Sequence, residues 1–160
     1  MALFLSTVIN KVDRKGRVSV PAAMRAALAN QPFQGIVAFR SFREPAIEGW
    51  SMDLLDRLAA SLDEMELFSE NRDDLASAIF ADAHQLPFDG EGRIVLPAVL
   101  AEHAGITDEA AFVGQGTTFQ IWNPATFASH AQTARERVRN QAALPRLRRP
   151  SGDGRQGDGR

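Results

Sequence analysis

The sequence predicts an α+β fold, mainly β, that is made of two equivalent units. A stretch of eleven residues occurs twice, at 12–22 and at 88–98. Each copy contains an apolar residue, Asp, two free positions, Gly, Arg, a short alternating run, Pro and Ala. A unit of roughly 45 residues is too small to bury its own apolar face well, so we expect the two units to pack together about a pseudo-two-fold axis.

Each copy has the chemistry of a tight turn between two short strands. Asp can accept hydrogen bonds from the backbone two residues further on, and Gly adopts a positive φ without steric cost. The turn-forming residues are Asp13 and Gly16 in the first copy, and Asp89 and Gly92 in the second. The alternating residues that follow predict a return strand.

The first unit reads as strands around one short helix. Pro21, like Pro97 in the second unit, favours a helix start because the first helical turn leaves its missing N–H unpaired anyway. Trp50 is expected in the core, as is Trp122 at the equivalent position. We predict strands at 3–9, 17–20, 35–39 and 46–50, and a helix from 21 to about 29.

The segment after the first unit is acidic and helical in pattern. Ser51 is placed to cap a helix with one apolar stripe, and a second helix is expected over 69–83. The stripe of the first helix consists of Leu54, Leu55, Leu58 and Leu62, and the buried face of the second consists of Leu75, Ile79 and Phe80.

The second half of the chain repeats the order of the first. Residues 111–114 correspond to 35–38, and 119–123 correspond to 47–51. Asn123 and Pro124 then predict a helix over 124–140, with Phe127 and Val138 facing inward. We divide the chain into repeat 1 at 7–51, an acidic helical spacer at 52–82, repeat 2 at 83–126, a C-terminal helix at 127–144, and a disordered Arg- and Gly-rich tail at 145–160.

Composition excludes several kinds of protein. The 160 residues include no cysteine, so there is no disulfide framework or thiolate site, and the three histidines lack metal-ligand spacing. We expect no secretory signal and no membrane span. The net charge of −2 hides an asymmetry, because residues 44–82 carry eleven acids and two bases, whereas 1–25 and 135–160 are strongly basic. This local field suits an anionic partner.

The first turn is a concentrated basic tip. Arg14, Lys15 and Arg17 surround it, and such a group suits phosphate contact. An arginine can also read guanine bidentately in the major groove, which is worth about 1–3 kcal/mol of discrimination. Asp13 could orient Arg17 through a charge-assisted bond. The turn therefore predicts binding to double-stranded DNA.

Two copies of Asp-x-x-Gly-Arg followed by Pro resemble the MraZ family of bacterial transcriptional regulators, which are tandem SpoVT/AbrB-type domains. The resemblance covers roughly residues 3–140. It implies a swapped-hairpin β-barrel with flanking helices, assembled into a ring-shaped homo-oligomer. It also implies a cytoplasmic, nucleoid-associated repressor of its own division and cell-wall operon, whose loops bind short G-rich direct repeats.

The resemblance assigns the DNA-facing loops residue by residue. Asp13, Gly16 and Arg17 match the motif in the first loop, and Asp89, Gly92 and Arg93 match it in the second. Arg14 and Lys15 stand at the free positions and are assigned from their charge alone. The second loop has Gly90 and Glu91 at those positions, so the sequence leaves open whether both loops contact DNA alike.

Other functions remain to be weighed against DNA binding. Arg17 and Arg93 could simply form salt bridges to Asp13 and Asp89. The two Asp residues are a poor match to an aspartic protease dyad, because Thr/Ser-Gly does not follow them and basic neighbours hold Asp13 ionised. We therefore expect no catalysis, no cofactor and no metal. The alternatives are an AbrB-type antitoxin and a protein-interaction scaffold that does not bind DNA.

Overall fold

The computed structural model describes residues 2–66, 68–141 and 144–150. It is an α+β protein dominated by strands, as predicted. Six strands form one antiparallel sheet in the order β1-β7-β8-β4-β3-β5, and two more, β2 and β6, form a separate antiparallel pair. The strands are β1 (Thr7–Lys11), β2 (Arg17–Ser19), β3 (Gly35–Arg40), β4 (Ile47–Trp50), β5 (His84–Pro87), β6 (Arg93–Val95), β7 (Glu109–Gly114) and β8 (Phe119–Trp122).

The strand pairing has a pseudo-two-fold pattern in which the two repeats exchange partners. β1 of the first repeat pairs with β7 of the second, and β5 of the second pairs with β3 of the first. In two further pairs, equivalent strands of the two repeats pair with each other: β4 with β8, and β2 with β6. Contacts of β2 with β1 and of β6 with β5 then place the small sheet between the two edges of the large one. The exchange is what the family resemblance implied.

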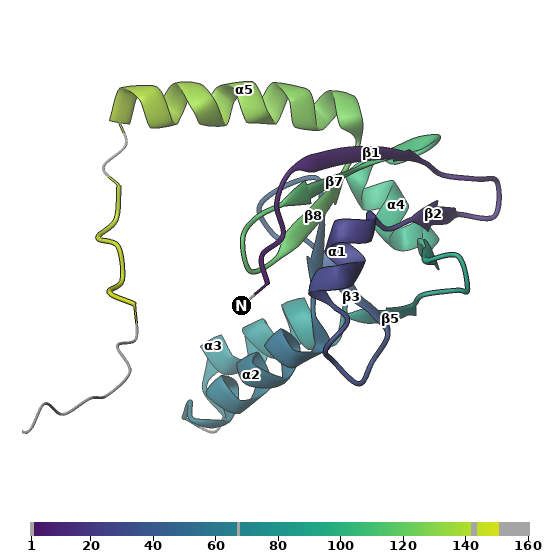
Figure 1. The fold of residues 1–160 in the computed structure, drawn as a ribbon. Coiled ribbons are helices and arrows are strands. Elements are labelled where there is room, and N and C mark those ends of the chain that lie inside the picture. Colours follow the sequence, from purple (N-terminus) through teal and green to yellow (C-terminus); the bar gives the residue numbers. More distant parts are fainter. Residues whose placement is uncertain (1, 67, 142–143, 151–160) are drawn as a thin grey trace, which may run out of the picture.

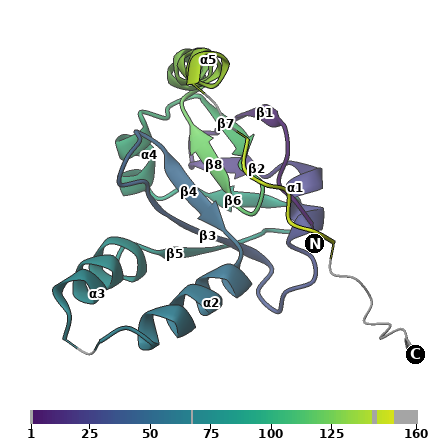
Figure 2. The same ribbon diagram turned by 90° about the vertical axis from the view of Figure 1, so that its left-hand side faces the viewer.

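Helices cover the large sheet on both faces (Figures 1 and 2). The main core lies between one face of the sheet, the β2–β6 pair, α1 and α4, and it includes Val18, Met24, Ile94, Leu100 and Phe112. The other face is shared between α2 with the following helical segment, which packs on β3, and α5, which packs on β7. The helices are α1 (Ala22–Ala27), α2 (Met52–Asp63), α3 (Glu70–Leu75), α4 (Ala98–Ala104) and α5 (Pro124–Gln141).

The local signals predicted most helix starts. The Ser51 hydroxyl accepts a hydrogen bond from Leu54 N–H at 3.1 Å, and the Asn123 side-chain oxygen accepts one from Ala125 N–H at 2.9 Å. Both helix caps are therefore confirmed. Pro21 and Pro97 occupy the cap position itself, one residue before α1 and α4, because their extended ψ values near 140° have not yet turned helical.

Several sequence expectations need correction. The first strand begins at Thr7 and not at residue 3, since Ser6 has a φ of 70°, which interrupts an extended chain. The helix expected over 69–83 is α3 followed by a π-helical turn, Ala76–Phe80 (η1), which brings the adjacent Ile79 and Phe80 to one cluster with Phe39.

Helix α5 reaches beyond the sheet, which changes the expected role of its C-terminal half. Phe127 packs on the buried Trp122, as expected, with ring centroids 5.6 Å apart. Val138 was predicted to face inward, but it is 61% exposed because the sheet ends before that turn of the helix (Figure 1).

Two further expectations concern other parts of the chain. Trp50 was expected in the core but is only half-buried, against Phe39. Residues 144–150 are exposed and form no helix or strand, while 151–160 of the predicted tail lie outside the described residues.

Candidate nucleic-acid interface

The first loop is built around the carboxylate of Asp13. One oxygen, Oδ1, accepts hydrogen bonds from the backbone N–H of Lys15 and of Arg17, both at 2.9 Å. The other, Oδ2, accepts from Nε of Arg17 at 2.7 Å. Gly16 closes the turn with a φ of 79° and donates its N–H to the Asp13 carbonyl at 3.0 Å. The loop thus holds Nε of the Arg17 guanidinium in a fixed position.

The second loop repeats this arrangement bond for bond. Oδ1 of Asp89 accepts from the N–H of Glu91 and of Arg93 at 2.9 Å, and Oδ2 accepts from Nε of Arg93 at 2.8 Å. Gly92 has a φ of 75° and donates to the Asp89 carbonyl at 3.0 Å. The salt bridges named as an alternative in the sequence analysis are therefore present in both loops. They use Nε and leave the two terminal nitrogens of each arginine outside the pair.

The two loops are joined through β2 and β6. Val20 N–H donates to the Gly92 carbonyl at 3.1 Å, and Leu96 N–H donates to the Gly16 carbonyl at 2.8 Å. Each loop therefore anchors the strand that leaves the other. Both turns project from the same side of the molecule in Figure 1, away from the C-terminal end of α5.

Arg17 and Arg93 lie on the same face of the β2–β6 pair. Arg17 is opposite Val95 and Arg93 is opposite Ser19, while Val18 pairs with Ile94 on the buried face. Because side chains alternate along a strand, the two arginines are diagonal neighbours, about 7–8 Å apart at their backbones. The structure thus brings together two arginines that are far apart in the sequence.

Charge distinguishes the two loops even though their scaffold is the same. Arg14 and Lys15 are exposed beside Arg17, whereas Gly90 and Glu91 occupy the equivalent positions beside Arg93. The Glu91 carboxylate lies 3.6 Å from Nε of Arg93. All the predicted contact residues are thus at the surface, but the cations concentrate on the first loop.

The two loop carboxylates are held ionised by their own turns. The backbone N–H of Arg17, followed by its guanidinium, lowers the pKa of Asp13 below the ordinary value of 3.8. The backbone N–H of Arg93 similarly lowers the pKa of Asp89. The hydrogen bond to Asp89 raises the pKa of Arg93, and the Asp13 carboxylate of the other loop adds to this effect. The field of one loop therefore reaches the other.

Sequence reasoning counted Arg25 only as part of the basic N-terminal segment. In the structure this α1 residue packs on Gly92 of the second loop. The motif comparison could not single it out, because the equivalent residue in the second repeat is Ala101. The sequence signal that could have identified Arg25 is this difference between the repeats, an arginine in the first where the second has an alanine.

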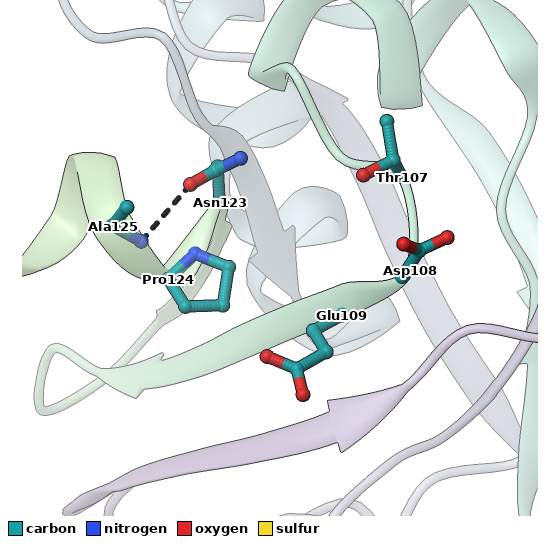
Figure 3. Close-up of a pocket in the computed structure, with 6 residues that line it drawn as sticks. All are labelled: Thr107, Asp108, Glu109, Asn123, Pro124 and Ala125. Atoms are coloured by element: carbon teal, nitrogen blue, oxygen red, sulfur yellow. Dashed lines mark hydrogen bonds between the residues drawn. The ribbon is translucent and has the colours of Figure 1, made fainter.

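Another hollow on the surface has a different character. It has a volume of about 350 Å³ and lies where α5 begins, between the 107–109 segment and the helix cap (Figure 3). Asp108 and Glu109 line it, so it does not suit a phosphate. Asn123 spends its side-chain oxygen on capping α5. Within the described ranges, no group of three acidic, His or Cys side chains could hold a metal ion, and no helix is long and apolar enough to cross a membrane.

Fold and site together define a tandem-repeat α+β protein with two Asp-x-x-Gly-Arg loops on one surface. The family model described as "MraZ protein, putative antitoxin-like" matches residues 79–148. The chain is 49% identical to the "Transcriptional regulator MraZ" of Gluconobacter oxydans (strain 621H), over 91% of each protein. Its identity to the proteins of that name from Pelagibacter ubique (strain HTCC1062) and Rickettsia bellii (strain OSU 85-389) is 46% and 44%, over 89% and 85% of this chain and over 92% and 91% of theirs. The chain belongs to the MraZ family of transcriptional regulators.

Proposed function

We propose that this protein binds double-stranded DNA in a sequence-dependent way and regulates transcription from the DNA upstream of its own reading frame. The observation that carries the proposal is the placement of Arg17 and Arg93 on one exposed face, each fixed by an aspartate of its own turn. The relatives that share most of its length are named as transcriptional regulators, which supports a regulatory and non-enzymatic role.

The bond pattern within each loop suits base recognition. Nε of Arg17 is bound to Asp13, so the side chain is oriented before DNA arrives. The two terminal nitrogens make no hydrogen bond to any residue that the structure describes, and together they can donate bidentately to the O6 and N7 atoms of a guanine. Pre-orientation reduces the entropy lost on binding. We therefore assign base reading to Arg17 and Arg93.

Arg14 and Lys15 have a different role in this proposal. Both are exposed at the tip of the first loop, and the structure shows no ion pair for either among the described residues. Long, solvated cations of this kind suit phosphate oxygens, which position a protein without reading sequence. The first loop thus combines positioning and reading, whereas the second has only the reading arginine within its motif.

Repression through a ring-shaped oligomer extends the same proposal. One protomer presents two closely spaced loops, so a ring would present many at fixed intervals and would engage short G-rich direct repeats with high effective concentration. Exposed apolar side chains are available for assembly at Leu5 and Ile9 near the N-terminus and at Val138 on α5. A protein with this role would work in the cytoplasm, in association with the nucleoid.

The antitoxin alternative is favoured by one observation, the antitoxin-like description of the matching family model. Such a function would pair DNA binding with a toxin partner. A scaffold that does not bind DNA would leave the basic loop unused. The exposed cations of the first loop therefore favour a DNA-binding function over the scaffold.

The test compares the wild type with Arg17→Ala and Arg93→Ala on DNA from upstream of the chain's own reading frame and on scrambled DNA, across a salt series. We expect tight binding to the first DNA only, which Arg17→Ala abolishes while the fold and the oligomeric state stay unchanged. Equal weak binding to both DNAs, or full binding by both variants, would contradict the proposal. Purification of the wild type from its own cells would show whether a toxin-like partner accompanies it.

A further inference from the structure

Arg25 belongs to α1 of the first repeat, yet its guanidinium covers the loop of the second. A Cβ atom placed on Gly92 would lie 2.6 Å from both Cζ and Nε of Arg25, and 2.8 Å from Nη1. Gly92 is consequently buried, whereas Gly16 in the first loop is only half-buried. Glycine at this position therefore leaves the space that the arginine occupies.

One hydrogen bond holds the guanidinium at this place. Nε of Arg25 donates to the Val20 carbonyl at 3.1 Å, and the N–H of the same Val20 donates to the Gly92 carbonyl. The helix residue, the strand and the loop are thus linked through one backbone unit. The terminal nitrogens of Arg25 make no hydrogen bond or ion pair to any residue of the described ranges, and they remain available to an outside acceptor.

The first loop has no counterpart of this arrangement. The residue equivalent to Arg25 is Ala101, and a Cβ atom on Gly16 would meet only backbone of Leu96, at 3.3 Å, and the Val95 side chain. Among the residues that the structure describes, the extra guanidinium thus occurs only at the loop that lacks Arg14 and Lys15. Counting the motif residues, the first loop carries three cations and one anion, while the second carries one cation and two anions.

We propose that Arg25 is a DNA-contacting residue of the second loop, where it supplies from the first repeat the phosphate-binding cation that Gly90 and Glu91 do not. The inference rests on the proposed DNA binding and deepens it. Arg93 reads a base, and Arg25 neutralises a neighbouring phosphate. The second loop therefore combines the same two roles as the first, but its phosphate-binding cation comes from helix α1 of the other repeat. The two loops then differ in how they are built and not in whether they engage DNA.

The experiment measures Kd for the upstream DNA over a salt series with the full chain. The variants are Arg25→Gln, Arg25→Lys, and Arg25→Gln combined with Glu91→Lys, which returns a cation to the loop. Arg57→Gln on the exposed side of α2 is the matched control. We expect Arg25→Gln to weaken binding several-fold and to lower the slope of log K against log salt by about one for each second loop engaged. Arg25→Lys and the Glu91→Lys combination should restore both.

Three results would overturn the inference. The first is an unchanged Kd and slope in Arg25→Gln when the wild type binds specifically, and this leaves the proposed function standing. The second is a loss that neither lysine restores, which would assign Arg25 a packing role alone, and a lowered thermal unfolding midpoint would accompany it. The third is absence of specific binding in the wild type, which overturns the proposed function as well.

Discussion

The two loops share one scaffold and carry different charges. Their turns agree in every hydrogen bond of the aspartate, with lengths that differ by at most 0.1 Å. At the third position the scaffold uses only the backbone N–H, from Lys15 in one loop and Glu91 in the other. The side chains at the two free positions therefore make none of the aspartate's hydrogen bonds, although Glu91 adds an ion pair to Nε of Arg93 at 3.6 Å.

This comparison separates two properties that the motif alone combines. The Asp, Gly and Arg positions determine how the arginine is held, and the free positions determine how strongly the loop attracts an anion. If that separation is correct, charge can be moved between the loops without unfolding either one.

The largest effect is expected from giving the first loop the charges of the second. Arg14→Gly with Lys15→Glu removes two phosphate-binding cations and adds an anion, so DNA affinity should fall on the order of ten- to a hundredfold with a smaller salt slope. The measurement is Kd by fluorescence anisotropy across a salt series, with the unfolding midpoint as a control on the fold.

The reciprocal change provides the matched control. Gly90→Arg with Glu91→Lys gives the second loop the charges of the first, and a Cβ atom at Gly90 would meet nothing within 4 Å. Affinity and salt slope should therefore rise. A first-loop variant that binds like the wild type would show that the charge difference between the loops has no role in binding.

A smaller effect is expected from filling the glycine of each turn. Gly16→Ala and Gly92→Ala both force an L side chain to a φ between 75° and 79°, which costs about 1–2 kcal/mol of stability. In Gly92→Ala the new methyl would also lie 2.6 Å from Cζ and Nε of Arg25, so the guanidinium must move and lose its hydrogen bond to the Val20 carbonyl. Gly92→Ala should therefore unfold at a lower urea concentration than Gly16→Ala.

DNA binding should then separate the two glycine variants. Displacing the Arg25 guanidinium in Gly92→Ala should lower the slope of log K against log salt. Gly16→Ala should keep the slope of the wild type, although it lowers the stability. Equal slopes in both variants would argue that Arg25 does not act at the second loop.

Local features of the fold could be predicted from the sequence, and long-range ones could not. The Asp13–Arg17 bond and the caps at Ser51 and Asn123 involve residues within four positions of each other, where turn and helix chemistry decides the outcome. The pairing of β2 with β6 joins residues about 76 positions apart, and from the residues alone we could predict only that the two units pack with pseudo-two-fold symmetry. The prediction that the units exchange strands depended on the family resemblance.

The candidate site shows the same division. Repetition identified both arginines and both turn glycines, but a search for equivalence passes over a residue that has no equivalent. Arg25 opposite Ala101 is such a residue, and its contact with Gly92 depends on how α1 packs across the repeat boundary. The prediction that Val138 faces inward was wrong for a related reason. Helical periodicity shows which face of α5 is apolar, but it does not show where the sheet beneath the helix ends.

The smallest effect is expected from pH. Both aspartates have a pKa below 3.8 in the folded protein, so their hydrogen bonds stabilise the loops fully above that value and are lost only as the pH falls through the lowered pKa. Between pH 5 and pH 8 the amide NMR signals of Lys15 and Glu91, which donate to these carboxylates, should therefore stay in place. They should shift together below pH 3.8.

A matched variant fixes the meaning of that titration. In Asp13→Asn the side-chain oxygen can still accept from the backbone, but the amide nitrogen is a donor and cannot accept from Nε of Arg17. The Lys15 signal should then lose its acid transition, while that of Glu91 keeps it, because each carboxylate is bonded chiefly within its own turn. A transition of either amide between pH 5 and pH 8 would contradict the lowered pKa values, and loss of both transitions in Asp13→Asn would show that the loops are coupled more strongly than their separate hydrogen bonds imply.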